Sequence, residues 1–166
     1  MSTTIVFTKS NSWLSKVIRW FTRGQSSHVM IGTRVHGTDM FLHSTAGGVQ
    51  FTPRPKELRG SSIVAEYKVV PYVEPGLRSA IAFVGDKYDY VGLLGYAWVI
   101  ILWRLFKKKV RNPLASPKAM VCSEFVAHLD RSGKYLPEFS GLDPEKTHPE
   151  HLRKICESSE NFERIA

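Results

Sequence analysis

Short segments rich in β-branched and aromatic residues are crowded into the first 70 positions of the chain. They are residues 3–8, 27–34, 38–44, 49–52 and 63–70. Apolar residues at helical spacing instead mark residues 13–23, 74–85, 119–131 and 147–158. Because the strands form one early block and do not alternate with helices, the sequence predicts an antiparallel sheet packed by helices, an α+β fold. A chain of 166 residues fits a single domain over residues 1–166.

Basic residues outnumber acidic residues by 23 to 15, which gives a formal charge of +8. One basic set, residues 107–109 with Arg111, follows an apolar stretch, and another, Lys16, Arg19 and Arg23, shares a helix with two tryptophans. Such surfaces attract lipid headgroups, cell-wall polymers or nucleic acid, although a solvated face accounts for them equally well. No zinc-finger, RNA-binding or basic-zipper motif is present, so nucleic acid is disfavoured and an anionic membrane surface remains a candidate partner.

The N-terminal residues lack the charged start and long apolar core of a signal peptide. The uncharged run 90–103 is shorter than a membrane span requires, so we expect a buried helix there, with a helix at a membrane interface as the alternative. These features fit a cytoplasmic protein or one exported by another route, and peripheral contact with a membrane stays open.

Cys122 falls in the first turn of the helix expected over 119–131. The unpaired N–H groups and the positive end of the helix dipole there favour thiolate, so we expect the thiol pKa to lie below about 8.5. Apolar residues on the same helix face should direct the sulfur towards the sheet, and a buried structural cysteine is the alternative. Cys156 is expected in the core, and the two cysteines fit no disulfide framework or zinc motif.

His28, at the start of an apolar strand, is a candidate base for this thiol. The alternative is a structural histidine at a sheet edge whose ring hydrogen-bonds to the backbone. If residues 36–37 form a two-residue turn, the continued register pairs Met30 with His43. Because side chains alternate, His43 then lies on the same face as His28, one diagonal step away. Nucleophile, base and orienting residue make up such a site, so we expect Cys122, His28 and His43 to meet.

Four short stretches carry a resemblance to a known family. They are residues 27–32 (SHVMIG), 41–44 (FLHS), 88–95 (YDYVGLLG) and 121–126 (VCSEFV). They resemble the circularly permuted branch of the NlpC/P60 (papain-like) superfamily, to which the lecithin:retinol acyltransferase-like proteins are related. In that branch the histidine strand precedes the cysteine helix, as here. The resemblance implies a permuted papain-like fold with Cys122 as nucleophile, His28 as base and His43 as third polar residue, where many members carry glutamate.

The expected activity is that of a cysteine hydrolase that cleaves amide or ester bonds through an acyl-enzyme, without metal or cofactor. The resemblance implies a peptidoglycan peptidase or amidase. A lipid acyl hydrolase or acyltransferase at a membrane is the alternative that the apolar and basic segment favours, and a binding module that has lost catalysis is a third. The four remaining histidines follow no metal-ligand spacing, and Tyr90 is expected in the core or lining the site.

Overall fold

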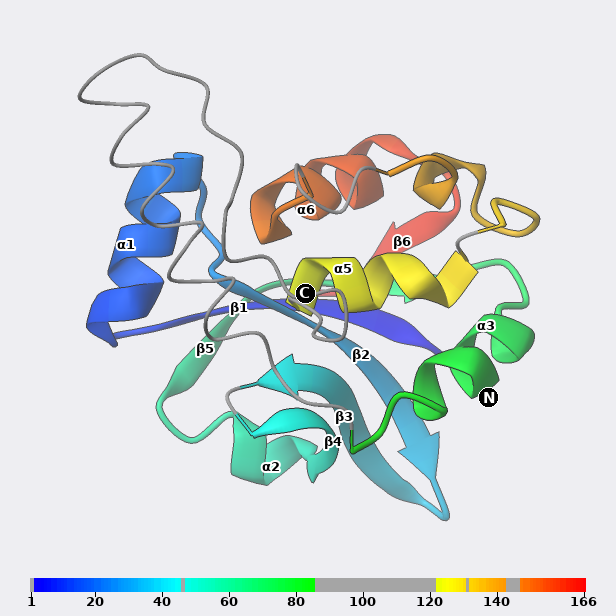
Figure 1. The fold of residues 1–166 in the computed structure, drawn as a ribbon, viewed down its shortest axis with the longest axis horizontal. Helices are drawn as coiled ribbons and strands as arrows, with labels where there is room; N and C mark the ends of the chain where they lie inside the picture. Colours follow the sequence, from blue (N-terminus) through cyan, green and yellow to red (C-terminus); the bar gives the residue numbers. More distant parts are fainter. Residues whose placement is uncertain (1, 46, 86–121, 131, 143–146) are drawn as a thin grey trace.

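The computed structural model describes residues 2–45, 47–85, 122–130, 132–142 and 147–166, with the side chains of Phe21 and Glu124 left out (Figure 1). Several expectations from the sequence concern residues outside these ranges. They are the apolar stretch that includes Tyr90, the basic residues 107–109 with Arg111, and the first residues of the helix expected from position 119.

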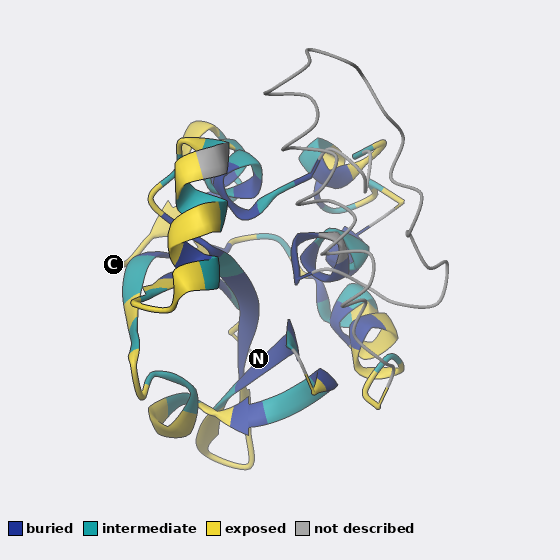
Figure 2. Cartoon of the chain, turned by 60° about the vertical axis from the view of Figure 1, so that its left-hand side comes forward, coloured by how far each residue is buried: buried dark blue, intermediate teal, exposed yellow. Residues whose placement is uncertain are grey.

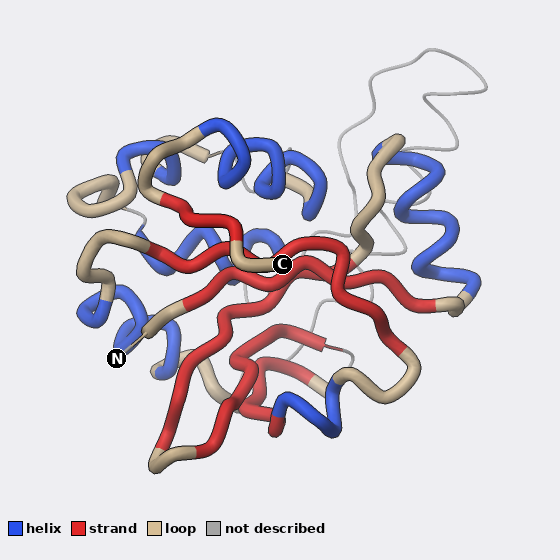
Figure 3. The backbone as a smooth tube through the Cα atoms, turned by 180° about the vertical axis from the view of Figure 1, so that it is seen from behind, coloured by secondary structure: helices blue, strands red, loops and turns tan. Residues whose placement is uncertain are grey.

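A sheet of six antiparallel strands, in the order β4-β3-β2-β1-β5-β6, forms the centre of the described part (Figures 1 and 3). The strands are β1 (Thr4–Ser10), β2 (His28–Val35), β3 (Thr38–Thr45), β4 (Gly48–Pro53), β5 (Ser61–Val69) and β6 (Phe162–Arg164). This sheet, packed by helices, confirms the α+β class. The short strand β6 was not expected, because its three residues carry no alternation, and backbone pairing with β5 alone makes it a strand.

Helices lie on both sides of the sheet. They are α1 (Trp13–Thr22), α2 (Arg54–Glu57), α3 (Glu74–Ile81), α5 (Cys122–Ala127) and α6 (Pro149–Ser158), with 3₁₀ turns at His128–Asp130 and Pro137–Phe139. The sequence did not predict α2 or the second 3₁₀ turn, because a single turn beside a proline is too short to show helical periodicity. Among the described residues, no helix has both the length and the apolar character that crossing a bilayer requires.

The ends of α1 are set by local chemistry. The helix begins after Ser12, whose hydroxyl accepts the N–H of Ser15 at 3.2 Å, and serine is a favoured residue at this position. It ends one residue earlier than expected, and Arg23, with φ of 51°, takes the left-handed position that glycine usually occupies. Gly24 is required for packing instead, because a Cβ there would lie 2.6 Å from the Cβ of Glu150 on α6.

Two apolar layers cover the two faces of the sheet. On the first face, inward residues of the strands such as Ile5, Ile31 and Leu42 pack beneath α3, α5 and α6 (Figures 1 and 2). The second face carries a smaller cluster over which α2 closes. That cluster consists of Val6, Met30 and Phe41, with Leu58 and Ile63 packed against it. The larger core therefore fixes α5, the helix that carries Cys122.

Buried polar contacts tie the helices to one another. The Ser123 hydroxyl donates to the Thr147 carbonyl oxygen at 2.7 Å and so joins α5 to the segment that leads into α6. The Glu150 carboxylate accepts the Gln25 N–H at 3.0 Å and two hydrogen bonds from Arg153, at 3.0 and 2.8 Å. Since Ser123, Thr147 and Glu150 are buried, their pairing holds α1, α5 and α6 in a fixed relation around the start of β2.

Candidate active site

The β2–β3 hairpin sets the relation between His28 and His43. Residues 36 and 37 both have positive φ, 46° and 81°, which is the geometry of the expected two-residue turn. From this turn the ladder runs back to Ile31 opposite Leu42. The turn and the register predicted from the sequence are therefore confirmed up to this pair.

Beyond that pair the two strands part from each other. In the described ladders β2 continues to His28 paired with β1, and β3 continues to Thr45 paired with β4. The expected pair of Met30 with His43 is the next position in this register, but the β2–β3 ladder ends before it, in the region where α5 packs against both strands. The two imidazoles still meet, with His28 Nε2 3.1 Å from His43 Nδ1 and ring centroids 5.4 Å apart.

Cys122 lies at the same end of β2. Its side chain is buried in the core beneath α5. The backbone N–H of Val29, the residue after His28, influences the pKa of the Cys122 thiol, which places the sulfur near β2. His28 and His43 therefore meet, whereas Cys122 lies in the core on the face of the sheet that α5 covers, and the catalytic roles of all three stay predictions.

His43 is completely buried and is held through both ring nitrogens. Its Nδ1 faces His28, and its Nε2 lies 3.1 Å from the Thr52 hydroxyl oxygen on β4 and 3.6 Å from a carboxylate oxygen of Glu57 on α2. Neither Thr52 nor Glu57 was among the expected site residues. Strand alternation from the β3–β4 register could have found Thr52, whereas Glu57 lies on the short helix that has no sequence signature.

These contacts favour one arrangement of protons. An ionised Glu57 favours a proton on the nearby Nε2 of His43. The Nδ1 of His43 then accepts a hydrogen bond from His28 Nε2–H, which leaves Nδ1 of His28 unprotonated. His28 is thereby prepared to take up a proton at Nδ1.

Both imidazoles are neutral at pH 7. Burial lowers the pKa of His28 to about 4. Burial, and secondly the proximity of His28, lowers the pKa of His43 to about 3. A neutral imidazole is the form that acts as a general base or binds a metal ion.

The pKa of the Cys122 thiol departs from the sequence expectation in the opposite direction. Burial raises it to about 11, against the opposing effect of the N–H groups of Val29, Ser123 and Cys122 itself. The expected lowering was wrong because the loss of hydration outweighs the donors at this position. The resting site therefore contains a neutral thiol and a neutral imidazole.

The same corner also brings together a set of metal-ligating atoms. One ligand atom each from His28, His43 and Glu57 lies within 4.8 Å of the other two. Spacing along the chain gave no sign of this group, because its members come from β2, β3 and α2. Two imidazoles and a carboxylate are ligands that zinc accepts.

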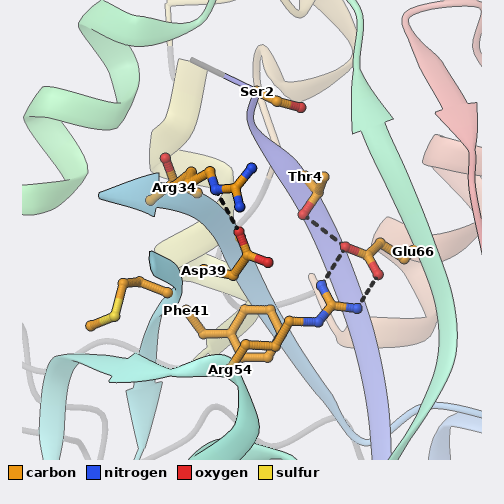
Figure 4. Close-up of a pocket in the computed structure, with 10 residues that line it drawn as sticks. Ser2, Thr4, Arg34, Asp39, Phe41, Arg54 and Glu66 are labelled. Atoms are coloured by element: carbon orange, nitrogen blue, oxygen red, sulfur yellow. Dashed lines mark hydrogen bonds and ion pairs between the residues drawn. The ribbon is translucent and has the colours of Figure 1, made fainter. Parts of the chain in front are cut away.

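A separate hollow of about 190 Å³ opens on the second face, farther along the strands (Figure 4). Its charged side chains form ion pairs with one another. Both Arg54 guanidinium NH groups donate to Glu66 carboxylate oxygens at 2.7 Å, and Arg34 lies 3.4 Å from Asp39. This pairing makes the hollow a structural junction of α2 with β5.

The other cysteine and histidine residues considered from the sequence contribute to packing or to helix capping. Cys156 is buried in the core, as expected, and burial raises the pKa of its thiol. The His128 ring packs against Phe83 with centroids 5.2 Å apart. His148 caps α6 by accepting the His151 N–H on its Nδ1 at 3.1 Å.

Comparison with known proteins adds a fold relationship. No family model matches the sequence, and no curated protein matches it. Among solved structures, the metalloprotein YiiX from Escherichia coli O157:H7, described as DUF1105, superposes with a TM-score of 0.61. The match covers 100% of this chain and 96% of the other at 16% sequence identity, so it shows a shared fold.

This neighbour corrects the family expected from the sequence. YiiX is described as a DUF1105 metalloprotein and points to a different family from NlpC/P60, so the predicted membership is wrong. The described residues of the short stretches behind it, such as 27–32 and 122–126, form an apolar strand and a helix that faces the core. Chains from separate families can form such elements with similar residues.

Proposed function

We propose that this protein is a cysteine hydrolase that cleaves amide or ester bonds through an acyl-enzyme on Cys122. The observation that carries this proposal is the hydrogen-bonded line from His28 through His43 to Thr52, on strands against which α5, the helix of Cys122, packs. Nucleophilic catalysis requires a base that is held by a second group, and we infer that the Cys122 thiol comes within reach of this base.

The neutral resting state implies that proton transfer accompanies attack. As the Cys122 sulfur forms a bond to the substrate carbonyl carbon, Nδ1 of His28 takes the thiol proton. His28 then donates this proton to the leaving amine or alcohol as the C–N or C–O bond breaks. Water, deprotonated by His28, attacks the thioester, and the C–S bond breaks as the sulfur regains a proton. The N–H of Cys122 is the donor that we assign to the oxyanion.

His43 is a positioning residue in this scheme. Its hydrogen bond to His28 selects the tautomer with a free Nδ1, and Thr52 and Glu57 hold His43 in turn. The preference for cell-wall peptide depended on the family resemblance and is withdrawn with it. Lipid esters and amides remain alongside peptides as candidate substrates. The description of the fold as permuted papain-like stays a prediction, and this chemistry does not depend on it.

Pre-steady-state hydrolysis of p-nitrophenyl esters of different acyl lengths tests the proposal. We expect a burst of p-nitrophenol equal to the enzyme concentration in wild type and in the control Cys156→Ser. Cys122→Ala should abolish the burst, and His28→Ala should slow it about 10²–10⁴-fold. Burst and turnover in Cys122→Ala equal to those of wild type would reject the proposal, and a correctly folded protein without turnover would favour the binding module.

A second candidate function is metal binding by His28, His43 and Glu57. The related fold of a protein described as a metalloprotein raises this question, and the donors of this chain fit. His43 Nε2 and the Glu57 oxygen are 3.6 Å apart, near the roughly 3.4 Å that separates two ligands on one tetrahedral zinc ion. A bound Zn²⁺ would supply a Lewis acid. Because it would occupy the imidazoles, it would compete with their role beside Cys122.

Isothermal titration with ZnCl₂ measures this binding independently of activity. We expect one zinc per chain in wild type and in the control His36→Gln, whose histidine lies in the exposed β2–β3 turn. Glu57→Gln should weaken the binding and His43→Gln should remove it. Equal binding by wild type and His43→Gln would assign the metal to another part of the chain.

A further inference from the structure

Helix α1 presents an apolar stripe to solvent. Trp13, Val17 and Trp20 follow one another at helical spacing, and their side chains are 71%, 41% and 60% exposed. Figure 2 shows the outward surface of this helix as exposed. Large exposed aromatic side chains at helical spacing form an interaction surface when the opposite helix face already serves the fold.

The opposite face of α1 is anchored to the protein. Ser15 is buried, and its hydroxyl shares a 2.7 Å hydrogen bond with the hydroxyl of Ser27, next to the start of β2. The residue after the helix cap, Gly24, packs against Glu150 of α6. Because both ends are fixed, the two exposed tryptophans are held at the surface by the fold.

Positive charge flanks the stripe. Lys16, Arg19 and Arg23 lie on α1 or its cap, and none forms an ion pair within 4 Å with another described residue. Residues 1–38 contain five basic residues and no Asp or Glu. The residues of and around α1 therefore carry an excess of positive charge with no ion pair to another described residue, which favours an anionic partner.

We propose that α1 binds the surface of an anionic lipid bilayer, with Trp13 and Trp20 at headgroup depth and Lys16, Arg19 and Arg23 against the lipid phosphates. Tryptophan rings prefer this interface, and basic residues beside an apolar helix face are typical of helices that lie in it. A protein partner fits less well, because a specific protein interface takes about 20–30 residues a side, and this stripe has three. The proposal is independent of the chemistry assigned to Cys122.

Co-sedimentation with vesicles tests the proposal directly. We expect wild-type protein to pellet with vesicles of phosphatidylcholine and phosphatidylglycerol and to stay in solution with phosphatidylcholine alone. Each basic residue removed should weaken binding about fivefold, so Lys16→Gln/Arg23→Gln should weaken it about 25-fold. The control Lys56→Gln/Lys154→Gln removes the same charge from exposed positions on α2 and α6 and should bind like wild type.

The tryptophans supply a second measurement. Brominated lipids should quench wild-type fluorescence more strongly than that of Trp13→Phe/Trp20→Phe, whose folding is checked by circular dichroism. Three results would overturn the proposal: no binding to either vesicle type, equal loss of binding in the α2/α6 control, or quenching unchanged by the tryptophan substitutions. Self-association that the tryptophan substitutions abolish, without vesicle binding, would assign the stripe to a second copy of the chain.

Discussion

Acidification from pH 7 to pH 5 should destabilise the folded protein through the two histidines of the site. Burial holds the pKa of His28 at about 4 and that of His43 at about 3, whereas an unfolded histidine titrates near about 6.5. Since the folded pKa is the lower one, the unfolded state takes up more protons as the pH falls. Stability is therefore complete above about pH 6.5 and is lost towards the folded pKa.

The size of the effect follows from these values. Each histidine should remove about 2 kcal/mol of unfolding free energy between pH 7 and pH 5, or about 4 kcal/mol for the pair. This is a large share of the about 5–15 kcal/mol that stabilises an ordinary domain. Burial also lowers the pKa of His148, so this residue adds to the pH dependence of stability. Its contribution is the same in wild type and in the variants.

Urea unfolding followed by circular dichroism at both pH values measures the loss. We expect His43→Gln to retain only about half of the pH-dependent loss assigned to the pair. His36→Gln, in the exposed turn, should keep the full loss and serves as the matched control. A wild-type protein whose stability changes by less than about 1 kcal/mol, or a His43→Gln variant with an unchanged slope, would refute the reasoning.

Three further predictions concern the Cys122 thiol, the ion pair of Arg54 with Glu66 and the buried hydroxyl of Thr33. Iodoacetamide should alkylate Cys122 in a Cys156→Ser background at a rate that keeps rising up to about pH 11, and a plateau near pH 7 would indicate a preformed thiolate. Glu66→Gln should lower the free energy of unfolding at neutral pH by about 3 kcal/mol, measured by urea unfolding. Because Arg54 lowers the pKa of Glu66, the difference between variant and wild type should shrink below about pH 4.5. A difference that stays constant with pH would contradict this prediction. Thr33→Val should change the free energy of unfolding by less than about 1 kcal/mol, since the buried hydroxyl has no hydrogen-bond partner among the described residues, and a larger loss would reveal one.

The antiparallel sheet and the meeting of His28 with His43 were accessible to sequence reasoning because both follow from period-two alternation and a recognisable turn. The turn at residues 36–37 alone determines that the two histidines share a face. Alternation carries no information about where paired strands stop pairing. The β2–β3 ladder ends where α5, a helix about 80 positions away in the chain, packs against both strands, and the sequence could not show that the ladder stops before Met30 and His43.

The pKa values and proton positions of the site were harder to predict from the sequence. A position at a helix start predicts a lowered thiol pKa, but the burial that reverses it at Cys122 arises from the packing of α5 on the sheet. Glu57 was missed for a related reason, since a four-residue helix has no periodicity and reaches His43 only through the β3–β4 pairing. Local patterns therefore identified the candidate groups of the site, whereas tertiary packing determined their protonation.

Peptide mapping of a trapped acyl-enzyme tests the central claim most directly. Wild type and Cys156→Ser, mixed with an activated p-nitrophenyl ester and quenched in acid, are digested and analysed by mass spectrometry. The account predicts one acyl group on the peptide that contains Cys122, formed far more slowly in a folded His28→Ala variant. Acylation confined to other residues, or formed at Cys122 at the same rate without His28, would contradict it.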